Sequence, residues 1–458
     1  MLFPRHVPYK TNKVLLYKMF RQQQLTALLA DRHILIAGYG REGKSTHALL
    51  QKLVPDAPFD IACNDDEIFN LLDKATSSNK PYDLIIKSPG ISTMKFEGRC
   101  NLNTITSQTD LFLQVYHDMT IAVTGTKGKS TTTTLIHHIL SHTFGSQRHI
   151  VLAGNMGIPL FDILDQLDEL SLIVAEFSCH QLENIHRAPH IGVILNLYQE
   201  HLDHYHDYHD YQMAKMQMML RQESEDHCFY CTDSQDLVDR VAEVKTHVST
   251  HLHPYSYSSH LQQLPSPLKG KHNLSNIAVA QQVTSLLGIT ADQFSNALNT
   301  FHGLPHRLEL VGTFNGITFY NDSISTIPEA TLAAVEALER VDTLILGGFD
   351  RGIDYTALAN YLSDPEHYGK QVSNLVFVGQ AGARMLQEWT DRPDEPIQGR
   401  LTLVENDYDA IVRWCYQHTQ RGRICLLSPA AASYDAFRNF EHRGDTFKSL
   451  ILQYANQQ

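Results

Sequence analysis

The stretch from Val123 to Thr131, which reads V-T-G-T-K-G-K-S-T, constrains the fold of this chain more than any other feature. An apolar run at 120–123 precedes it, and apolar residues at helical spacing follow it as far as Leu140. A strand, a glycine-rich loop and a helix in this order place backbone N–H groups and a helix N-terminus around a phosphate. The stretch therefore predicts a phosphate-binding turn.

Individual residues of this turn have the chemistry that a phosphate site needs. Gly125 and Gly128 let the backbone approach a ligand closely. Lys129 supplies positive charge for phosphate oxygens, and the Ser130 hydroxyl is a suitable Mg²⁺ ligand. Val123 stands where the strict P-loop motif has a glycine, so an ordinary turn with chance glycines is the alternative. The Gly-Lys-Ser run between strand and helix favours the phosphate site.

Length and composition indicate a globular protein of about three domains. Of the 458 residues, 43% are hydrophobic and 19% are charged, values that are ordinary for globular proteins. The formal net charge of −13 argues against nucleic acids and anionic membranes as partners. An anionic ligand must therefore meet local positive charge.

The cysteines and the N-terminus favour the cytoplasm. Seven cysteines, an odd number without a compact framework, are typical of a reducing compartment. Cys228 and Cys231 form a lone C-x-x-C pair, which we interpret as strand residues. No apolar run reaches the roughly 18 residues of a membrane helix, and residues 1–18 lack the apolar core of a signal peptide.

The first region predicts a small α/β domain. Residues 1–30 are a polar extension with a short helix, and an apolar strand at 33–37 then leads into G-Y-G-R-E-G at 38–43. G-x-G-x-x-G between a strand and a helix indicates a phosphate or pyrophosphate at the turn. A further apolar strand at 83–87 ends in Ser88-Pro89-Gly90, a tight turn.

The second region has apolar strands at 150–153, 172–175 and 191–195, and polar residues follow each of them. Continuous apolar runs are expected for parallel strands that are covered on both faces. Ligands of such sheets bind outside the carboxyl ends of the strands. The following polar groups therefore predict one site shared with the phosphate loop: Asn155; Glu176 and Ser178; Asn196, Glu200, His201 and Asp203.

Several of these residues are candidates for metal binding. Glu176 could hold Mg²⁺ beside the Ser130 hydroxyl. The run at 200–211 is rich in histidine but fits no closed zinc motif, and His201 and Asp203 are its best functional candidates. Lys215 lies among methionines at helical spacing, as a lysine at a core edge does.

The third region alternates strands at 318–320, 343–346, 375–378 and 424–427 with helical stretches, which predicts another doubly wound sheet. Leu304-Pro305-His306-Arg307 stands at its start. Arg307 could reach a γ-phosphate when domains close, and a hinge ion pair is the alternative.

Taken together, these motifs resemble the Mur ligases, the ATP-dependent amide ligases that build the peptide of peptidoglycan. The resemblance covers about residues 33–450, and the loop at 124–131 is its most specific part. The other motifs follow in the family's order: Asn155, Glu176 with Ser178, Asn196 to His201 with Asp203, Lys215, His272-Asn273 to Asn276, Leu304 to Arg307, and Asn321-Asp322-Ser323. The first glycine turn with Ser88-Pro89-Gly90, and Leu427 to Ala430 with Ser433, Phe440 and Arg443-Gly444, are similar to the MurD branch, which adds glutamate to UDP-N-acetylmuramoyl-L-alanine.

The resemblance implies an α/β fold of three domains. Residues 1–112 would form the N-terminal extension and a Rossmann-like UDP-binding domain. Residues 113–305 would form a central P-loop-type ATPase domain, and residues 306–458 a Rossmann-like domain that binds glutamate. The implied protein is a cytoplasmic monomer whose partners are UDP-MurNAc-L-Ala, glutamate and ATP, without nucleic acid or membrane.

The resemblance also implies the residues of each site. ATP would be bound by Gly125, Thr126, Lys127, Gly128, Lys129, Ser130, Thr131, Asn276, Arg307 and Asp322. The UDP substrate would meet Gly38, Gly40, Gly43, Ser88, Asn155 and Ser178, and glutamate would meet Thr326, Arg351, Ser433 and Phe440. Of two Mg²⁺ ions, one would be held by Ser130 and Glu176, and the other by His201 and a carbamylated Lys215. The catalytic residues would be Lys129, Glu176, His201 and Lys215.

Three departures from the branch bear on the substrate. Lys127 stands where asparagine is frequent, Ile324 where many members have lysine, and Arg351 where a lysine is expected. These positions are similar to a sub-branch that adds L-glutamate, whereas the stretch at 433–444 is more similar to the D-glutamate enzymes. We therefore predict D-glutamate, with L-glutamate as the alternative.

Three further alternatives differ in function. A folylpolyglutamate-type ligase would not need the first glycine turn. A non-catalytic, nucleotide-dependent regulatory protein would hydrolyse ATP without transfer. An NAD oxidoreductase rests on the turn at 38–43 alone.

Overall fold

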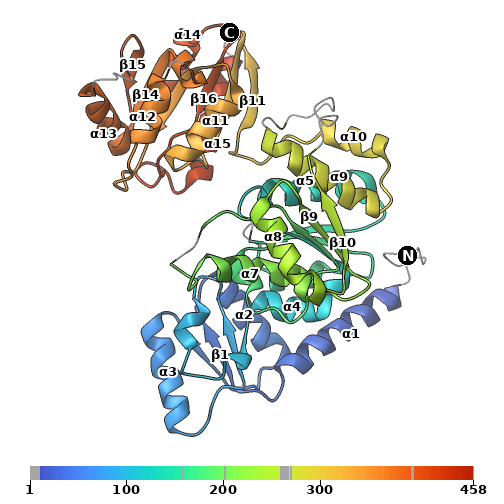
Figure 1. The fold of residues 1–458 in the computed structure, drawn as a ribbon. Helices are drawn as coiled ribbons and strands as arrows, with labels where there is room; N and C mark the ends of the chain where they lie inside the picture. The colour runs from blue at the N-terminus through green and yellow to red at the C-terminus, as the bar shows by residue number, and fades with distance from the viewer. Residues whose placement is uncertain are drawn as a thin grey trace. The chain divides into compact units, whose positions relative to one another are not determined.

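Three β-sheets form the framework of the computed structural model (Figure 1). The structure describes residues 11–155, 158–200, 203–257, 268, 271–364, 366–392 and 397–456. The chain divides into two compact units, one formed by residues 1–265 and 272–301, the other by residues 266–271 and 302–458. The α/β class is confirmed. The first two sheets share one unit, and the domain boundaries at 112/113 and 305/306 remain a prediction.

The first sheet has four parallel strands in the order β2-β1-β3-β4. Its side chains pack into a core with α3 through residues such as Leu35, Ile68 and Leu72. The elements are β1 (Ile34–Ala37), α2 (Arg41–Leu53), β2 (Phe59–Ala62), α3 (Asp65–Ser77), β3 (Leu84–Lys87) and β4 (Ile105–Thr106). The predicted strands are present, and β4 was not predicted because two residues carry no periodicity.

The N-terminal helix α1 (Thr11–Leu29) is longer than the short helix that the sequence predicted. It packs beside α4 (Gln108–Tyr116) (Figure 1). Leu25 and Leu29 of α1 are each 1% exposed, and the Arg21 guanidinium binds the Val115 carbonyl and the Asp118 carboxylate. The helix that the sequence predicted is therefore present and longer, and Leu25 and Leu29 anchor its C-terminal half in the first unit while Leu16, Met19 and Phe20 are exposed.

The central sheet has six parallel strands in the order β10-β9-β8-β5-β7-β6. β5 and β7 are buried along their whole length, as expected for strands covered on both faces. The elements are β5 (Thr120–Thr124), α5 (Lys129–Phe144), β6 (Ile150–Gly154), β7 (Leu172–Glu176), α6 (Cys179–Leu182), β8 (Ile191–Ile194), α7 (Tyr208–Leu220), β9 (His227–Cys231), α8 (Gln235–Val244), β10 (His251–Tyr255), α9 (Lys271–Leu286) and α10 (Ala291–Asn299). Cys228 and Cys231 lie in β9, as predicted.

The third sheet has the order β11-β12-β16-β13-β14-β15, and only β11 runs antiparallel to its neighbour. One core forms between the sheet and α11, α12 and α13 through residues such as Leu344 and Leu375. A second core forms with α14 and α15 through Ile345 and Val376. Both faces are therefore covered. The elements are β11 (Glu309–Phe314), β12 (Ile317–Asn321), α11 (Pro328–Leu338), β13 (Val341–Gly347), α12 (Thr356–Ser363), β14 (Asn374–Val378), α13 (Gly379–Thr390), β15 (Leu401–Val404), α14 (Tyr408–His418), β16 (Ile424–Leu427) and α15 (Phe440–Ala455).

Among the described residues, no helix combines the length and the apolar character that crossing a membrane requires.

Candidate active site

Polar groups from four neighbouring strands meet at one edge of the central sheet. β8, β5, β7 and β6 lie side by side and parallel, so their carboxyl ends share this edge. Asn155, which follows β6, donates from Nδ2 to Oε1 of Glu176 at the end of β7 over 2.8 Å. Asn196, which follows β8, accepts at Oδ1 from the backbone N–H groups of Thr126 (3.1 Å) and Lys127 (2.8 Å). The structure thus brings together the strand-end residues that the sequence suggested as one site.

The phosphate loop between β5 and α5 requires glycine at two positions. Gly128 has φ +87°, and a Cβ there would lie 2.7 Å from Oδ1 of Asn276. Gly125 has φ +147°, and its Cβ would lie 2.9 Å from Cβ of Leu195. Such backbone is strained for residues with a side chain. Asn276 of α9 therefore lies against the loop.

The cationic residue of the loop folds back onto the loop itself. Lys129 donates from Nζ to the carbonyl oxygens of Gly125 (3.0 Å) and Thr126 (2.8 Å). Lys127 is exposed, and its backbone carbonyl accepts from Nδ2 of Asn196. Ser130 and Thr131 follow in the first turn of α5, where unpaired N–H groups and the helix dipole favour an anion. Because Asn196 engages the Thr126 and Lys127 N–H groups and the loop carbonyls engage Lys129, the N–H groups of the first turn of α5 are the donors that remain for a phosphate.

Glu176 has the properties of a cation ligand. Its side chain is 2% exposed, and only Oε1 has a hydrogen-bond partner, Asn155. Oε2 is buried without a partner among the described residues. An ionised oxygen in the interior without a donor is costly, and Mg²⁺ prefers carboxylate oxygen. The residue therefore fits a magnesium site beside the phosphate loop.

Lys215 of α7 is buried directly under the loop. It is 2% exposed, Nζ donates to the Gly125 carbonyl over 3.0 Å, and the Tyr211 ring centroid lies 4.9 Å from Nζ. Burial, together with the charge of Lys129, lowers the pKa of Lys215 to about 8, although the nearby Cys179, Glu200 and Glu176 act in the opposite direction. The amine therefore exchanges readily between its charged and neutral forms near neutral pH.

The structure describes part of the histidine-rich run after β8. His201 lies outside the described residues. Asp203 is exposed. His204 is buried and contacts the carboxylate of Glu183, with 3.3 Å between Nε2 and Oε2. Tyr211, which the sequence did not single out, has its hydroxyl 2.7 Å from Oγ1 of Thr126.

The first glycine turn packs against the turn after β3. Gly38 has φ +95°, and its carbonyl accepts from the Ser88 hydroxyl over 3.0 Å. A Cβ on Gly43 would lie 2.1 Å from the same carbonyl oxygen. Gly40, by contrast, precedes α2 in open space. Gly38, Gly43 and Ser88 thus shape the turn, and Gly40 leaves room at the N-terminus of α2.

Ser178 is a helix cap in this structure. Its hydroxyl accepts from the Gln181 N–H over 3.3 Å, and the Gln181 carboxamide accepts from the Ser178 N–H over 3.0 Å. The Gln181 amide also donates to the carboxylate of Glu42 over 2.8 Å. Burial raises the pKa of Glu42 to about 7, against the hydrogen bond from Gln181 and the charge of Lys87. This chain of contacts links the first glycine turn to the segment after Glu176.

Sequence reasoning missed a buried ion pair between the first two sheets. Lys87, 1% exposed, binds the carboxylate of Glu183 and donates to the Ile91 carbonyl over 2.7 Å. Burial lowers the pKa of Lys87. Burial alone would raise the pKa of Glu183, but hydrogen bonds from His204, Lys87 and Thr93 and the charge of Lys87 outweigh it. The pKa of Glu183 is therefore held at about 2. A lysine that ends an otherwise apolar strand was the signal available in the sequence.

In the second unit, Asp322 follows β12 and supports the loop that carries Arg307. Its carboxylate accepts from the Ser428 hydroxyl (2.7 Å) and the Leu308 N–H (3.1 Å). Burial raises the pKa of Asp322 to about 6. His306 has φ +64° and Leu308 has φ +43°, and Arg307 between them is exposed. The strained backbone holds this arginine at the surface.

Of the four residues predicted to bind glutamate, Arg351 and Thr326 are in contact. Arg351 donates from Nη2 to the Thr326 carbonyl over 2.7 Å. Ser433 is 2% exposed, and Phe440 opens α15. The fully buried Arg443 donates to the hydroxyl and the carbonyl of Ser323, each over 2.9 Å, and the same hydroxyl donates to the Phe440 carbonyl. Arg443 thus fixes the loops on which these residues stand.

Comparisons with known proteins agree with this geometry. Residues 123–284 match the family model of the Mur ligase middle domain. The chain is 30% identical to the UDP-N-acetylmuramoylalanine--D-glutamate ligase of Desulfitobacterium hafniense over 93% of this chain and 98% of that protein. It is likewise 30% identical to the enzyme of that name from Listeria innocua, over 92% and 96% of the two chains.

Solved structures share the fold. MurF from Acinetobacter baumannii has a TM-score of 0.55 at 14% identity, over 76% of this chain and 82% of that one. UDP-N-acetylmuramate-alanine ligase MurC from Thermotoga maritima has a TM-score of 0.53 at 15% identity, over 93% and 100%. The strand-edge site and these relatives lead to one conclusion. The chain belongs to the Mur ligase family, in the branch of the UDP-N-acetylmuramoylalanine--D-glutamate ligases.

Proposed function

We propose that this chain joins D-glutamate to UDP-N-acetylmuramoyl-L-alanine in an ATP-dependent reaction of peptidoglycan synthesis. The observation that carries the proposal is the edge of the central sheet. There, Oε2 of Glu176, which is buried and has no partner among the described residues, would act as a cation ligand beside the glycine loop at 125–131, which would bind an anion. The names of the relatives supply the substrate.

ATP and the UDP substrate would be bound at the two glycine turns. Gly125 to Thr131, with Asn276, would hold the ATP phosphates, and Arg307 and Asp322 would complete the site. Gly38, Gly40, Gly43 and Ser88 would form the anion site at the N-terminus of α2, where the dipole favours a pyrophosphate. Asn155 and Ser178 would contact the remainder of the UDP substrate. The open space at Gly40 supports this role.

Two Mg²⁺ ions would be held at the edge of the central sheet, one by Ser130 and Glu176, the other by His201 and Lys215. Lys215 as an amine is a poor ligand. A carbamate on Nζ would make it an anionic oxygen ligand, and the lowered pKa of about 8 supports that modification because CO₂ reacts with the neutral amine. Bound Mg²⁺ would neutralise phosphate charge.

The reaction would proceed in two displacements. An oxygen of the alanyl carboxylate attacks the γ-phosphorus of ATP, and ADP leaves with the bonding electrons of the broken P–O bond. The glutamate amine then attacks the acyl carbon, loses a proton, and phosphate leaves. Lys129 would offset negative charge on the transferring phosphoryl group, and the buried floor formed by Glu176 and Lys215 would exclude water.

Thr326, Arg351, Ser433 and Phe440 would bind glutamate. Arg351 is exposed and has its guanidinium next to the Thr326 carbonyl, so a carboxylate could be bound there through a charge-assisted pair. The proposed place of action is the cytoplasm, because the substrates are nucleotides and the seven cysteines are free thiols. That the enzyme acts as a monomer remains a prediction.

The test is phosphate release by the purified chain with ATP, Mg²⁺ and UDP-MurNAc-L-Ala, with D- or L-glutamate added separately. We expect release to depend on all substrates and to be greatest with D-glutamate, and mass spectrometry should show one added glutamyl group. Release with L-glutamate alone would overturn the stereochemical part. ATP hydrolysis without a mass gain would instead identify a regulatory ATPase and overturn the ligase proposal.

A further inference from the structure

Three imidazoles gather on one face of the two outermost strands of the central sheet. β9 and β10 are parallel, and His251 stands opposite His227 in register. His253, two residues further along β10, lies on the same face of the strand. His227 is the first residue of β9, so this histidine group lies towards the amino ends of the strands. The candidate active site lies at the carboxyl ends.

The rings of these histidines are in contact. Nδ1 of His227 lies 2.9 Å from Nε2 of His253. The ring centroid of His227 lies 5.1 Å from that of His251 and 5.1 Å from that of His253. Imidazole nitrogen is a preferred ligand of Zn²⁺ and its first-row neighbours. We propose that His227, His251 and His253 form a binding site for a divalent transition-metal ion such as Zn²⁺.

The rings have the protonation that a metal requires. Burial lowers the pKa of His227 to about 4, with the neighbouring His253, His190 and His251 acting in the same direction and Asp226 against it. Burial also lowers the pKa of His253. In the present contact between His227 and His253, one ring donates N–H and the other accepts. On metal binding, the donor ring would move this proton to its other nitrogen, so that both lone pairs face the ion and no proton is lost.

Only His227 and His253 have ring nitrogens in contact in the structure, so the His251 ring has to rotate to complete the site. Two nitrogens on one tetrahedral Zn²⁺ stand about 3.3 Å apart when each Zn–N bond is 2.0–2.1 Å, slightly more than the contact between His227 and His253. His251 is exposed, so its ring can turn between rotamers to bring a nitrogen to the same point. Three protein ligands leave the fourth position of the ion to water.

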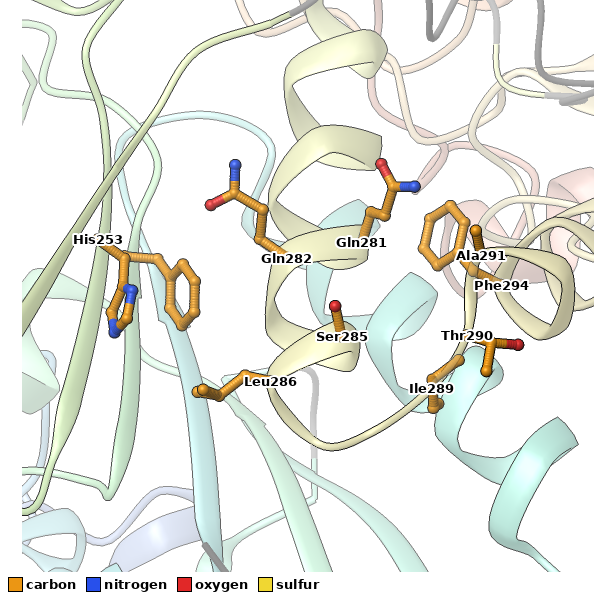
Figure 2. A pocket seen from close by; sticks show the side chains of 10 residues that line it. His253, Gln281, Gln282, Ser285, Leu286, Ile289, Thr290, Ala291 and Phe294 are labelled. Carbon is orange, nitrogen blue, oxygen red and sulfur yellow. The ribbon is translucent and has the colours of Figure 1, made fainter.

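Neighbouring groups support the site. The Phe229 ring stacks on that of His253, with centroids 4.5 Å apart. The Asp226 carboxylate lies 2.9 Å from Nδ1 of His190, whose ring lies 5.8 Å from that of His227, and it also pairs with the Arg187 guanidinium over 2.7 Å. This ion pair holds His190 beside the histidine group. His253 also forms one wall of a pocket of about 450 Å³ between β10, α9 and α10, with Gln282 and Leu286 facing it (Figure 2). Solvent, and hence a metal ion, can reach the imidazole.

A second cluster provides a matched control. Among the described residues, Asp207, His209 and Asp210 have ligand atoms within 4.8 Å of one another. Asp207, however, caps α7 by accepting from the Asp210 N–H, and His209 contacts Glu243. These groups already have structural partners, so His209→Ala tests whether any surface histidine would give the same result.

The experiment uses the full chain without an affinity tag, stripped of metal and kept in excess Mg²⁺ to saturate the active site. Titration with ZnCl₂ by calorimetry should show one site per chain. His227→Gln and His253→Gln should each weaken it at least tenfold, and His209→Ala should not. Co²⁺ bound to the unaltered chain should give the visible absorption of a tetrahedral site, and X-ray absorption should count three imidazoles. The proposal would be overturned if the unaltered chain showed no stoichiometric Zn²⁺ binding, or if binding persisted unchanged in both glutamine variants. A count of fewer than three imidazoles would also overturn it.

Discussion

The Nζ atom of Lys215 lies 3.0 Å from the carbonyl oxygen of Gly125, so the middle of α7 is tied to the first residue of the phosphate loop. The two residues are remote in sequence, because the segment from α5 to β8 lies between them. Among the described residues, the buried Nζ contacts the Gly125 carbonyl and the ring of Tyr211. A buried ammonium group with so few partners is poorly stabilised, which is why its pKa falls to about 8.

Replacing Lys215 should separate catalysis from nucleotide binding. In Lys215→Ala and Lys215→Arg the carbamate cannot form, and we expect phosphate release to fall at least about 100-fold, the range for loss of a charge-stabilising group. ATP affinity, measured by calorimetry, should change by only a few-fold because the loop glycines and Lys129 remain. ¹³C NMR with ¹³CO₂ should show a carbamate signal in the native chain and none in Lys215→Arg. An arginine variant with native turnover would contradict the proposed role.

The Glu42 carboxyl should make stability depend on pH. Between about 4.5 and 7, the folded chain retains a proton on Glu42 that the unfolded chain has released. Stability therefore falls as pH rises through this window. Glu42→Gln keeps the hydrogen bond from Gln181 and removes the titration. Its free energy of unfolding relative to the native chain should rise from pH 5 to pH 7 by about 1–3 kcal/mol.

Denaturant unfolding at several pH values measures this difference. The exposed Glu225→Gln serves as the control, and it should leave the pH dependence unchanged. A constant difference between Glu42→Gln and the native chain across the window would show that Glu42 is ionised in the folded state.

Two glycines with the same backbone should respond differently to alanine. Gly128 has φ +87° and its Cβ would meet Asn276, whereas Gly288 has φ +90° and faces open space. Both alanine variants should lose about 1–2 kcal/mol of stability through the left-handed backbone. Only Gly128→Ala should also raise the KM for ATP, by about tenfold or more, because it displaces the loop. Equal KM values in the two variants would refute a nucleotide contact at Gly128.

The Lys87–Glu183 pair should show strong coupling in a double-mutant cycle. Lys87→Met leaves a buried carboxylate without its cation, and we expect a loss of about 3–5 kcal/mol. Adding Glu183→Gln removes the orphan charge and should recover a large part of this loss. Thermal and urea unfolding of the four proteins gives the coupling energy. Additive losses would mean that the two side chains do not depend on each other.

Much of the fold could be predicted because parallel strands buried on both faces are continuous apolar runs. β1, β5, β7, β8 and β16 are of this kind, and each is found within a residue or two of its predicted position. Edge strands carry a weaker signal. β15 is mostly exposed, and β11 contains an irregular register between Leu310 and Gly312, so neither has a clear pattern. The packing of α1 was missed because its apolar residues do not mark one face: Leu25 and Leu29 are buried, whereas Leu16, Met19 and Phe20 are exposed.

The candidate site was predictable where a motif has a fixed spacing, and less so where tertiary contacts decide the role. The loop at 125–131 and Glu176 were identified from their place after strands. Asn196 was noted as a polar strand-end residue and as part of the motif at 196–201, but its contact with two loop N–H groups was not predicted. The use of Ser178 as a helix cap and the pairing of Lys87 with Glu183 depend on neighbours that are remote in the chain. Such neighbours cannot be read from one sequence.

The place of β16 in the third sheet has a consequence for synthesis on the ribosome. β16 lies between β12 and β13, although more than 75 residues separate its start at 424 from the end of β13 at 347. Until this late strand emerges, β12 and β13 have no partner between them, and the C-terminal sheet remains split. The first two sheets are complete with β10, at 255, and can form as units much earlier. A nascent chain interrupted shortly before β16 would therefore carry two finished sheets and an open, aggregation-prone third sheet.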